Sequence, residues 1–240
     1  MYEGLSVMAM APVFNEERKI GSVLDRVPGG IVDEMVVVDD GSTDGSAALA
    51  RSKGATVISM GATVGVGAAL RSGFKYGVDH GHDVVVVMAG NNKDAPEEIP
   101  RLLEPIAAGH ADLVQGSRWL SGNRDFGPMP AYRKVATRLH PRLFSAVAGQ
   151  HFTDSTNGFR AVSAKVLADP GLDLDQDWLD QYELEPYLLY KAVKLGYRVT
   201  EVPVTKVYPA KTLGQTKMKP IIGWWSMLRP IVLLGLRLKR

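Results

Sequence analysis

The amino-acid sequence predicts a single α/β domain in which helices flank a central, mostly parallel sheet. Short apolar runs of strand length alternate with helical segments, and acidic or turn-forming residues follow the predicted strands. The 240 residues contain neither a Pro/Gly/Ser-rich linker nor an internal repeat, and 45% of them are hydrophobic, which suits one buried core. These observations favour one soluble globular domain.

The first elements that the sequence predicts are two strands with a helix between them, over residues 6–13, 15–27 and 34–38. The second strand ends in Asp39 and Asp40. Ligands of open parallel sheets bind at the carboxyl ends of the strands, where loops converge and helix N-termini offer free N–H groups. We therefore expect Asp39 and Asp40 to lie near a bound nucleoside.

Ser42 and Asp44 follow in the same loop and allow two interpretations. Either residue could cap the helix that begins near Ser46. Alternatively, the loop carries ligand contacts, as loops at such positions often do. A helix cap accounts for one acidic residue in this loop and not for three.

The next predicted elements are a helix, a strand, a glycine-rich loop and a second helix, over residues 47–53, 55–59, 61–67 and 68–77. Gly61, Gly65 and Gly67 would let the backbone approach a phosphate or a ribose. The steric needs of a turn explain the same glycines equally well.

A run of β-branched residues over 83–88 predicts a central strand that is buried on both faces. It leads into residues 89–94, which read AGNNKD. Asp94 stands shortly before a proline and two glutamates, as the N-cap residue of a helix does. A further strand, over 112–116, leads into Arg118.

The polar loop over 122–130 is of a kind that stays mobile until substrate binds. The helix after it carries Arg133, Lys134, Thr137 and Arg138 at spacings that share a face. Several donors on that face could meet one phosphate, or the face could simply be solvated.

Two later segments are rich in polar groups. Residues 154–160 are too polar and too turn-rich for a core, so we expect a loop that presents donors and acceptors to a ligand. Residues 180–185 place three carboxylates just before an apolar helix. These acids suit either a helix N-terminus or a catalytic base, for which Glu183 is the candidate.

Charge is distributed unevenly along the chain. Eight of the 28 basic residues and none of the 26 acidic ones follow Glu201, so the tail is strongly cationic and the remainder is acidic overall. This split favours an anionic partner for the tail. We expect no nucleic acid among the partners.

Residues 220–240 combine Trp224 and Trp225 with two apolar runs and basic flanks. Arg229 and Pro230 interrupt the apolar runs, which fall short of the roughly 20 uncharged residues that span a bilayer. We expect an amphipathic helix on an anionic membrane surface, with a helix packed on the sheet as the alternative. We expect the boundary between this segment and the catalytic domain, residues 1–219, to lie at residue 220.

The chain contains no cysteine, which excludes disulfides, thiolate metal ligands and a cysteine nucleophile. Its N-terminus lacks the basic flank and the long apolar stretch of a signal peptide. We expect a cytoplasmic protein that is peripheral at the inner face of the membrane.

The ordered motifs resemble those of the family-2 glycosyltransferases of the GT-A (Rossmann-like) fold, in the branch of the dolichyl- and polyprenyl-phosphate mannose or glucose synthases. The motifs are PVFNE at 12–16, the stretch 36–46, GVGAA at 65–69, GSR at 116–118, Arg133-Lys134, residues 154–159 and GQTK at 214–217. They cover almost the whole chain. The resemblance implies inverting transfer of a sugar from a nucleotide donor to a polyprenyl phosphate.

The resemblance also implies roles for individual residues. The donor site would be formed by Pro12, Phe14, Glu16 and Asp39 around the base and ribose, by Gly65, Gly90 and Asn91, and by Lys217 at the diphosphate. The acceptor phosphate would be held by Arg118, Arg133, Thr137 and Asn157. A lipid phosphate is already anionic, so positioning and charge neutralisation supply most of the catalysis. Phe14 stands where the family often has tyrosine.

The chain departs from this family at the metal motif. The family pattern is Asp-any-Asp with a third ligand two residues later, and this chain has Ala89, Asn91 and Lys93 there. Alanine offers no ligand, asparagine offers a neutral carbonyl, and an ammonium repels a cation.

We hypothesise that Lys93 substitutes for the metal ion, with Lys217 and Arg160 completing the neutralisation of the leaving diphosphate. In the alternative, Asn91 and Asp94 bind Mg²⁺ or Mn²⁺ together with phosphate oxygens and waters. No cofactor is firmly expected.

Three functions remain open. The first is transfer to a polyprenyl phosphate, with Lys93, Arg118 and Arg133 as catalytic residues. The second is a soluble transferase for a small hydroxyl acceptor, which would need Glu183 as its base. The third is a non-catalytic binder of nucleotide sugars. The donor could be a UDP-, GDP- or dTDP-linked sugar.

Overall fold

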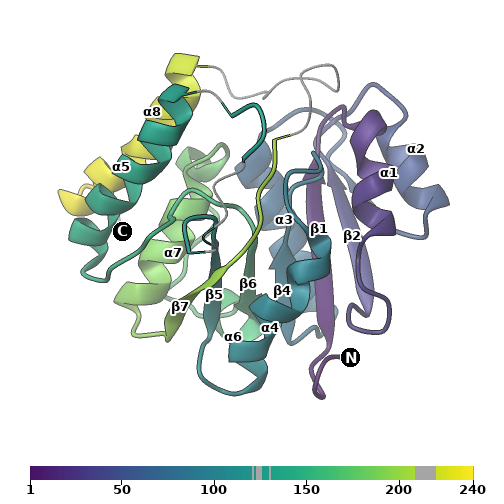
Figure 1. Ribbon diagram of the computed structural model, residues 1–240, viewed down its shortest axis with the longest axis horizontal. Helices are drawn as coiled ribbons and strands as arrows, with labels where there is room; N and C mark the ends of the chain where they lie inside the picture. The colour runs from purple at the N-terminus through teal and green to yellow at the C-terminus, as the bar shows by residue number, and fades with distance from the viewer. Residues whose placement is uncertain (121, 123–125, 130, 209–219, 240) are drawn as a thin grey trace.

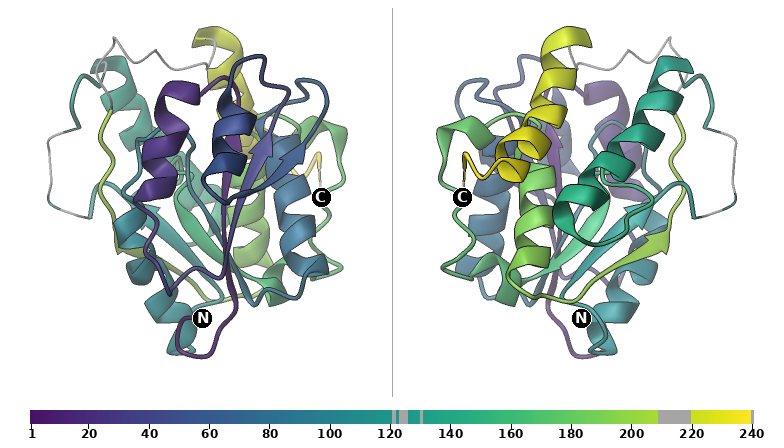
Figure 2. Two further views of the ribbon diagram at one scale, coloured as in Figure 1. Left: turned by 90° about the vertical axis from the view of Figure 1, so that its right-hand side faces the viewer. Right: turned by 90° about the vertical axis from the view of Figure 1, so that its left-hand side faces the viewer.

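The protein is described by a computed structural model that covers residues 1–120, 122, 126–129, 131–208 and 220–239. A seven-stranded sheet runs through its centre, and helices cover both faces (Figures 1 and 2). The strands are β1 Val7–Val13, β2 Glu34–Asp39, β3 Thr56–Ser59, β4 Val84–Val87, β5 Leu113–Ser117, β6 Arg160–Ser163 and β7 Val199–Pro203. Their order across the sheet is β3-β2-β1-β4-β6-β5-β7.

Every described pairing in this sheet is parallel except the two made by β6, which runs against β4 and β5. The expected α/β domain with a mostly parallel sheet is therefore confirmed. Because β6 is reversed, its first residue, Arg160, pairs with Gln115 near the carboxyl end of β5. The segment that enters β6 consequently lies at the same edge of the sheet as the ends of the parallel strands.

Helices connect every pair of successive strands, and the last helix follows β7. They are α1 Glu17–Asp25, α2 Ser46–Ser52, α3 Val66–Asp79, α4 Ile99–Ala107, α5 Ala131–Ala148, α6 Ala164–Leu167, α7 Leu184–Lys194 and α8 Pro220–Gly235, with short 3₁₀ helices η1 at Pro96–Glu98 and η2 at Asp177–Leu179.

Side-chain alternation along the strands produces one core on each face of the sheet. Met8 and Met10 of β1 face α3, α5, α7 and α8, whereas Val7 and Ala9 face α1, α2 and α4. Successive residues of a strand point to opposite faces, so a central strand that is apolar throughout supports both cores. The fully buried β4 is the clearest case.

Two expectations about local structure are wrong. Residues 154–160 are not too polar for a core, since Asp154, Ser155, Asn157 and Arg160 are all buried, and a ligand contact of this segment stays a prediction. Most of their polar groups find partners inside the fold, which offsets the cost of burying them, although Arg160 Nε has no hydrogen-bond partner among the described residues. Asp94 is not a helix cap either, because its carboxylate accepts hydrogen bonds from the Ala89 N–H and the Lys206 ammonium.

The C-terminal apolar run is also not broken at Arg229 and Pro230, because α8 continues through the proline. A proline inside a helix costs a hydrogen bond, and packing supplies the compensation. Ile231 and Leu234 lie in the core beside α5 and α7 residues, and the His140 ring is 3.0 Å from the Met227 carbonyl oxygen. Among the described residues, no helix combines the length and apolarity needed to cross a membrane.

The start of α3 packs tightly against the turn before α7. The Gly67 N–H donates to the Asp180 carbonyl (2.9 Å), and a Cβ at residue 67 would overlap the Leu179 carbonyl oxygen. Gly65 has a φ of 139° and would meet the Asp180 carbonyl in the same way. These glycines therefore allow close approach of two backbones.

We predict that Gly67→Ala lowers the free energy of unfolding by about 2 kcal/mol or more, because the turn at residues 179–181 must move away. The measurement is chemical denaturation of the two proteins side by side. Gly29→Ala is the matched control, since nothing lies within 4 Å of a Cβ there. Equal effects of the two substitutions would contradict the argument from close approach.

Candidate active site

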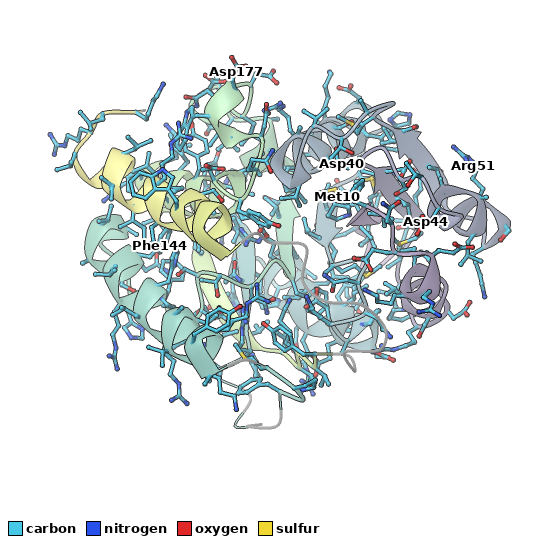
Figure 3. The ribbon with its side chains drawn as sticks, turned by 90° about the horizontal axis from the view of Figure 1, so that it is seen from above. Met10, Asp40, Asp44, Arg51, Phe144 and Asp177 are labelled. Atoms are coloured by element: carbon cyan, nitrogen blue, oxygen red, sulfur yellow. The ribbon has the colours of Figure 1, made fainter. Side chains whose placement is uncertain are left out.

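The candidate site lies at the carboxyl edge of the sheet, which is seen from above in Figure 3. The segments after β1, β2, β4, β5 and β7 meet there, together with the segment that enters β6. The charged residues of these segments are buried to an unusual extent. Asp39, Asp94, Arg118, Asp154, Arg160 and Lys206 each expose less than a tenth of their surface.

The predicted nucleoside residues come together where β1 and β2 end, because Val13 pairs with Asp39. Phe14 is half-buried beside this point. The Glu16 carboxylate is buried and lies 2.5 Å from the Lys19 ammonium. Asp39 accepts a hydrogen bond from the Ser42 N–H (3.2 Å). The fold thus gathers Pro12, Phe14, Glu16 and Asp39, and their roles toward a donor remain predictions.

The loop after β2 is held by hydrogen bonds to its neighbours. Asp40 accepts from the N–H groups of Val64 (2.7 Å) and Gly65 (3.1 Å), so its carboxylate organises the glycine-rich loop. Asp44 accepts from the first N–H group of α2, at Ser46 (3.0 Å), but the N-cap residue of α2 is Gly45, so the expected side-chain cap is absent. Figure 3 shows both aspartates on the half of the edge that belongs to α1 and α2.

Ser42 has a different role from the cap that the sequence allowed. Its hydroxyl accepts a hydrogen bond from the Asn15 N–H (2.9 Å) and so ties the β2 loop to the end of β1. Asn15 has a φ of 51° and returns the contact by accepting from the Thr43 N–H (2.8 Å). The two loops that would hold a nucleoside are therefore bound to each other.

A cluster of cations lies after β4. The Lys93 ammonium sits 5.2 Å from the centre of the Tyr208 ring, and the Arg133 guanidinium approaches the same ring at 5.7 Å. Burial, together with the positive charges of Lys206 and Arg133, lowers the pKa of the Lys93 ammonium to about 8, against the opposing effect of Asp94 and Glu16. Because burial and mutual repulsion destabilise the positive charges of this site, an anionic ligand would stabilise them.

Lys206 is the residue of this site that the sequence analysis missed. Its ammonium lies 2.5 Å from Asp94 and donates to the Asn157 side-chain oxygen at 2.7 Å, although the three residues are far apart in the sequence. It follows β7 and forms a bridge to Asp94. The signal that could have found it is its place as the first cation of the basic tail, directly after a strand.

The donor set does not fit a divalent ion. Ala89 has no ligand atom, and both carboxylate oxygens of Asp94 are engaged by Lys206 and by the Ala89 N–H. The Asn91 side-chain oxygen is buried without a hydrogen-bond partner in the described residues, but it is a single neutral ligand. Within those residues, no group of three His, Cys, Asp or Glu side chains could hold a metal ion.

The predicted acceptor residues fall into two groups. Arg118 forms a buried ion pair with Asp154, with 2.6 Å between Nε and Oδ2, and also contacts Thr156. Asn157 is fully buried and donates to the Gly116 carbonyl. Arg118 and Asn157 therefore serve the internal framework of this edge, and direct contact with an acceptor is untested.

Arg133 and Thr137 form the second group, on the inward face of α5. Both are buried, whereas Lys134 and Arg138 are exposed, so these four residues do not share one face. The Thr137 hydroxyl donates back to the Arg133 carbonyl (2.8 Å). Arg133 is consequently the described α5 cation that faces the site, next to Tyr208.

The remaining candidates lie around α7 or beyond the described residues. Glu183 is buried, one oxygen is 3.5 Å from the Arg229 guanidinium, and the other has no hydrogen-bond partner among the described residues. Burial raises the pKa of this carboxyl, against the lowering effect of Arg229. Arg160 is buried and pairs with Glu185 at 3.3 Å. Lys217 and residues 123–125 and 130 of the loop over 122–130 lie outside the described residues.

Known proteins are similar to this chain in sequence and in fold. Residues 9–169 match the family described as glycosyl transferase family 2. The chain is 33% identical over 223 residues to the undecaprenyl-phosphate mannosyltransferase of Micrococcus luteus, covering 89% of this chain and 88% of that protein. It is 32% identical over 218 residues to the polyprenol monophosphomannose synthase of Mycolicibacterium smegmatis, covering 88% and 80%.

Solved structures agree on the fold. Glucosyl-3-phosphoglycerate synthase from Mycobacterium tuberculosis, crystallised with Mn²⁺, UDP and glucosyl-3-phosphoglycerate, superposes with a TM-score of 0.70 at 23% identity, over 98% of this chain and 80% of that one. The expected fold of a sugar-nucleotide transferase is thereby confirmed. The chain belongs to glycosyl transferase family 2, and its class is that of the glycosyltransferases.

We predict that Lys206→Met lowers the free energy of unfolding by about 3–5 kcal/mol, because Asp94 is left as an unpaired buried charge. The measurement is denaturant unfolding, with the double variant Lys206→Met/Asp94→Asn expected to recover much of the loss. Lys53→Met is the control, since its partner Asp25 is exposed and such a pair contributes about 1 kcal/mol or less. A loss no larger than that of the control would contradict a structural role for this pair.

Proposed function

We propose that this glycosyltransferase moves a sugar, with inversion, from a nucleoside-diphosphate donor to the phosphate of a polyprenyl phosphate. The observation that carries the proposal is the pair of cations Lys93 and Arg133 beside the Tyr208 ring at the carboxyl edge, in a chain whose relatives include named undecaprenyl- and polyprenol-phosphate mannosyltransferases. The donor is a UDP-, GDP- or dTDP-linked sugar.

The chemistry suits an edge that is rich in cations. An oxygen of the acceptor phosphate attacks the anomeric carbon of the sugar, the new C–O bond forms, and the bond from that carbon to the diphosphate breaks. The leaving nucleoside diphosphate takes the bonding electrons and gains negative charge. The acceptor phosphate is already an anion, so the reaction needs charge neutralisation and alignment more than a base.

Lys93 is proposed to neutralise the leaving diphosphate in place of a divalent ion. Structural neighbours were crystallised with Mn²⁺ or Mg²⁺, so a metal is a reasonable expectation for the fold. The residues of this chain favour the other solution, since an ammonium stands among them and Asp94 is held by Lys206. Lysine binds phosphate as a point charge. Lys217 is proposed as a further contact.

The place of action is proposed to be the cytoplasmic face of a membrane, where a lipid acceptor presents its phosphate. The basic C-terminal segment, residues 220–240, supports this location. The remainder, residues 1–219, is proposed as the catalytic unit, although α8 packs onto it.

A hydroxyl acceptor is the second candidate function. It is favoured by Glu183, whose raised pKa and unpartnered oxygen are properties of a carboxylate that can take up a proton. Product analysis with a lipid phosphate and with a hydroxylated acceptor, each supplied with a panel of nucleotide sugars, separates the two candidates.

We predict that transfer to polyprenyl phosphate continues in excess EDTA at a rate within about threefold of the untreated enzyme, because the leaving group is balanced by fixed cations. The measurement is nucleoside-diphosphate release after dialysis against the chelator. Complete loss of activity that Mg²⁺ or Mn²⁺ restores would overturn the metal-free mechanism.

We predict that Lys93→Ala lowers kcat by about 100-fold or more, as the loss of one preorganised charge contact usually does. In the wild type, kcat/KM should fall as the pH rises through about 8, since the free ammonium loses its proton there. Lys93→Arg should have a lower rate but no such decline, because a guanidinium stays charged. Identical pH profiles for the wild type and Lys93→Arg would contradict the assignment.

A further inference from the structure

Two helices that are far apart in the sequence lie side by side at one end of the sheet, as Figures 1 and 2 show for α5 and α8. They are joined through His140 of α5, whose ring contacts the Met227 carbonyl, and through Val147, which packs beside Gly235. Ile231 and Leu234 of α8 are buried beneath this contact. The pair therefore forms one surface whose outer side faces solvent.

The outer side of α5 carries an apolar stripe. Tyr132, Val135, Leu139 and Leu143 have exposed fractions of 54%, 67%, 50% and 45%. Their spacing of three, four and four residues places them on one side of a helix. An exposed stripe of this length is unusual for a soluble surface and indicates a contact with something apolar.

A row of basic residues runs beside this stripe. Lys134, Arg138 and Arg142 follow one another at intervals of four residues, and all three are exposed. Arg138, the middle residue of the row, also stacks over the ring of Trp119, just beyond the end of β5, at 4.5 Å. The sequence of α5 contains no acidic residue.

The outer side of α8 continues the apolar surface. Trp225, Val232 and Leu236 are exposed at 58%, 43% and 66%, and their spacing of seven and four residues also defines one side of a helix. Exposed Arg237 and Lys239 follow the helix. Residues 220–239 contain no acidic residue either.

The α5 stripe borders α8, so the two apolar faces adjoin. Leu143 follows His140 by three residues and precedes Val147 by four, which makes it a surface neighbour of both residues that contact α8. The basic row lies on the other side of the stripe. The combined surface thus has apolar side chains in the middle and cations along its margins.

We propose that this α5–α8 surface docks onto an anionic lipid membrane, with its apolar side chains among the acyl chains and its basic margins against the headgroups. This inference rests on the proposed function, because the purpose of docking would be to bring a lipid acceptor to the site. It assigns to α5 a membrane contact that the sequence indicated only for the C-terminal segment. Apolar faces flanked by cations and aromatic side chains are typical of interfacial helices.

The orientation that follows suits the site. The inward side of α5 carries Arg133, next to Tyr208 and Lys93, while the outward side carries the stripe. A membrane against the outward side would therefore lie one helix thickness from the cation cluster, about 10 Å away. A lipid phosphate at the headgroup level could reach the cluster while its chain remained in the membrane.

A second copy of the chain fits this surface less well than an anionic membrane does. The only charged side chains of α5 and of residues 220–239 are cationic, so pairing the surface with itself would bring basic rows of like sign together. An anionic bilayer satisfies both the apolar centre and the basic margins. Self-association is nevertheless a defined outcome of the experiment.

The test is co-sedimentation of the full chain with vesicles of phosphatidylcholine, alone or mixed with phosphatidylglycerol, at low and high salt. We expect binding to the anionic vesicles that weakens with salt. Leu139→Ser/Leu143→Ser and, separately, Lys134→Gln/Arg138→Gln/Arg142→Gln should each reduce vesicle binding at least about tenfold. Unchanged binding of both variants would overturn the role of α5.

The matched control for charge is Arg51→Gln/Lys75→Gln/Lys194→Gln, which removes the same charge from exposed positions on α2, α3 and α7. Figure 3 shows Arg51 pointing outward on the α2 side. This control should bind vesicles within about twofold of the wild type. A loss equal to that of the α5 triple variant would mean that net charge, and not this surface, drives the binding.

A transfer assay keeps this inference separate from the proposed function. With a short-chain, water-soluble prenyl phosphate, Leu139→Ser/Leu143→Ser should match the wild type, and with a long-chain polyprenyl phosphate in vesicles it should be slower. Vesicle binding without transfer to either acceptor would reject the function and leave the surface intact. Transfer without wild-type vesicle binding, or dimers in sedimentation velocity that this variant dissociates, would reject the surface.

Discussion

The buried ion pair between Lys206 and Asp94 is the constraint on which the candidate site depends. It joins the segment after β7 to the segment after β4, and the contact with Asn157 extends it to the segment that enters β6. A lone buried charge is costly, so each partner fixes the position of the other. The backbone around Lys93 is held by the same arrangement, since the Val207 N–H donates to the Lys93 carbonyl.

The other charges at this edge follow the same logic of internal pairing. A buried cation that forms an ion pair with a carboxylate stabilises the fold. A buried cation without such a pair can bind an anionic ligand. Lys93, half-buried and beside further cations, is of the second kind, which is why its pKa is depressed. The ion pairs at this edge include three whose partners are both buried, Lys206 with Asp94, Arg118 with Asp154 and Lys19 with Glu16, and the pair of buried Arg160 with the partly exposed Glu185.

The C-terminal helix connects this edge to the proposed membrane surface. The Arg229 guanidinium contacts the buried Glu183 carboxylate, and the Met227 carbonyl oxygen contacts the His140 ring. Helix α8 is therefore linked to the start of α7 and to α5. Burial lowers the pKa of His140, which keeps the ring neutral in this position. Docking of α8 and α5 on lipid would therefore act on residues that also border the candidate site.

The sequence by itself predicted five of the seven strands, a mostly parallel sheet, the family resemblance and most of the residues that gather at the carboxyl edge, because strand periodicity and ordered motifs are local signals. It did not predict β6, β7 or the order of the strands. Only the tertiary structure decided which charges pair. Asp94 resembles a helix cap in sequence and is the partner of Lys206 in space. Residues 154–160 are too polar for a core by their composition, yet Asp154, Ser155, Asn157 and Arg160 are buried. Pairing and burial depend on neighbours that are distant in the chain, and local patterns carry no information about them. For the same reason, the apolar stripe on α5 can be recognised as part of a larger surface only from the tertiary structure, in which α8 packs beside α5.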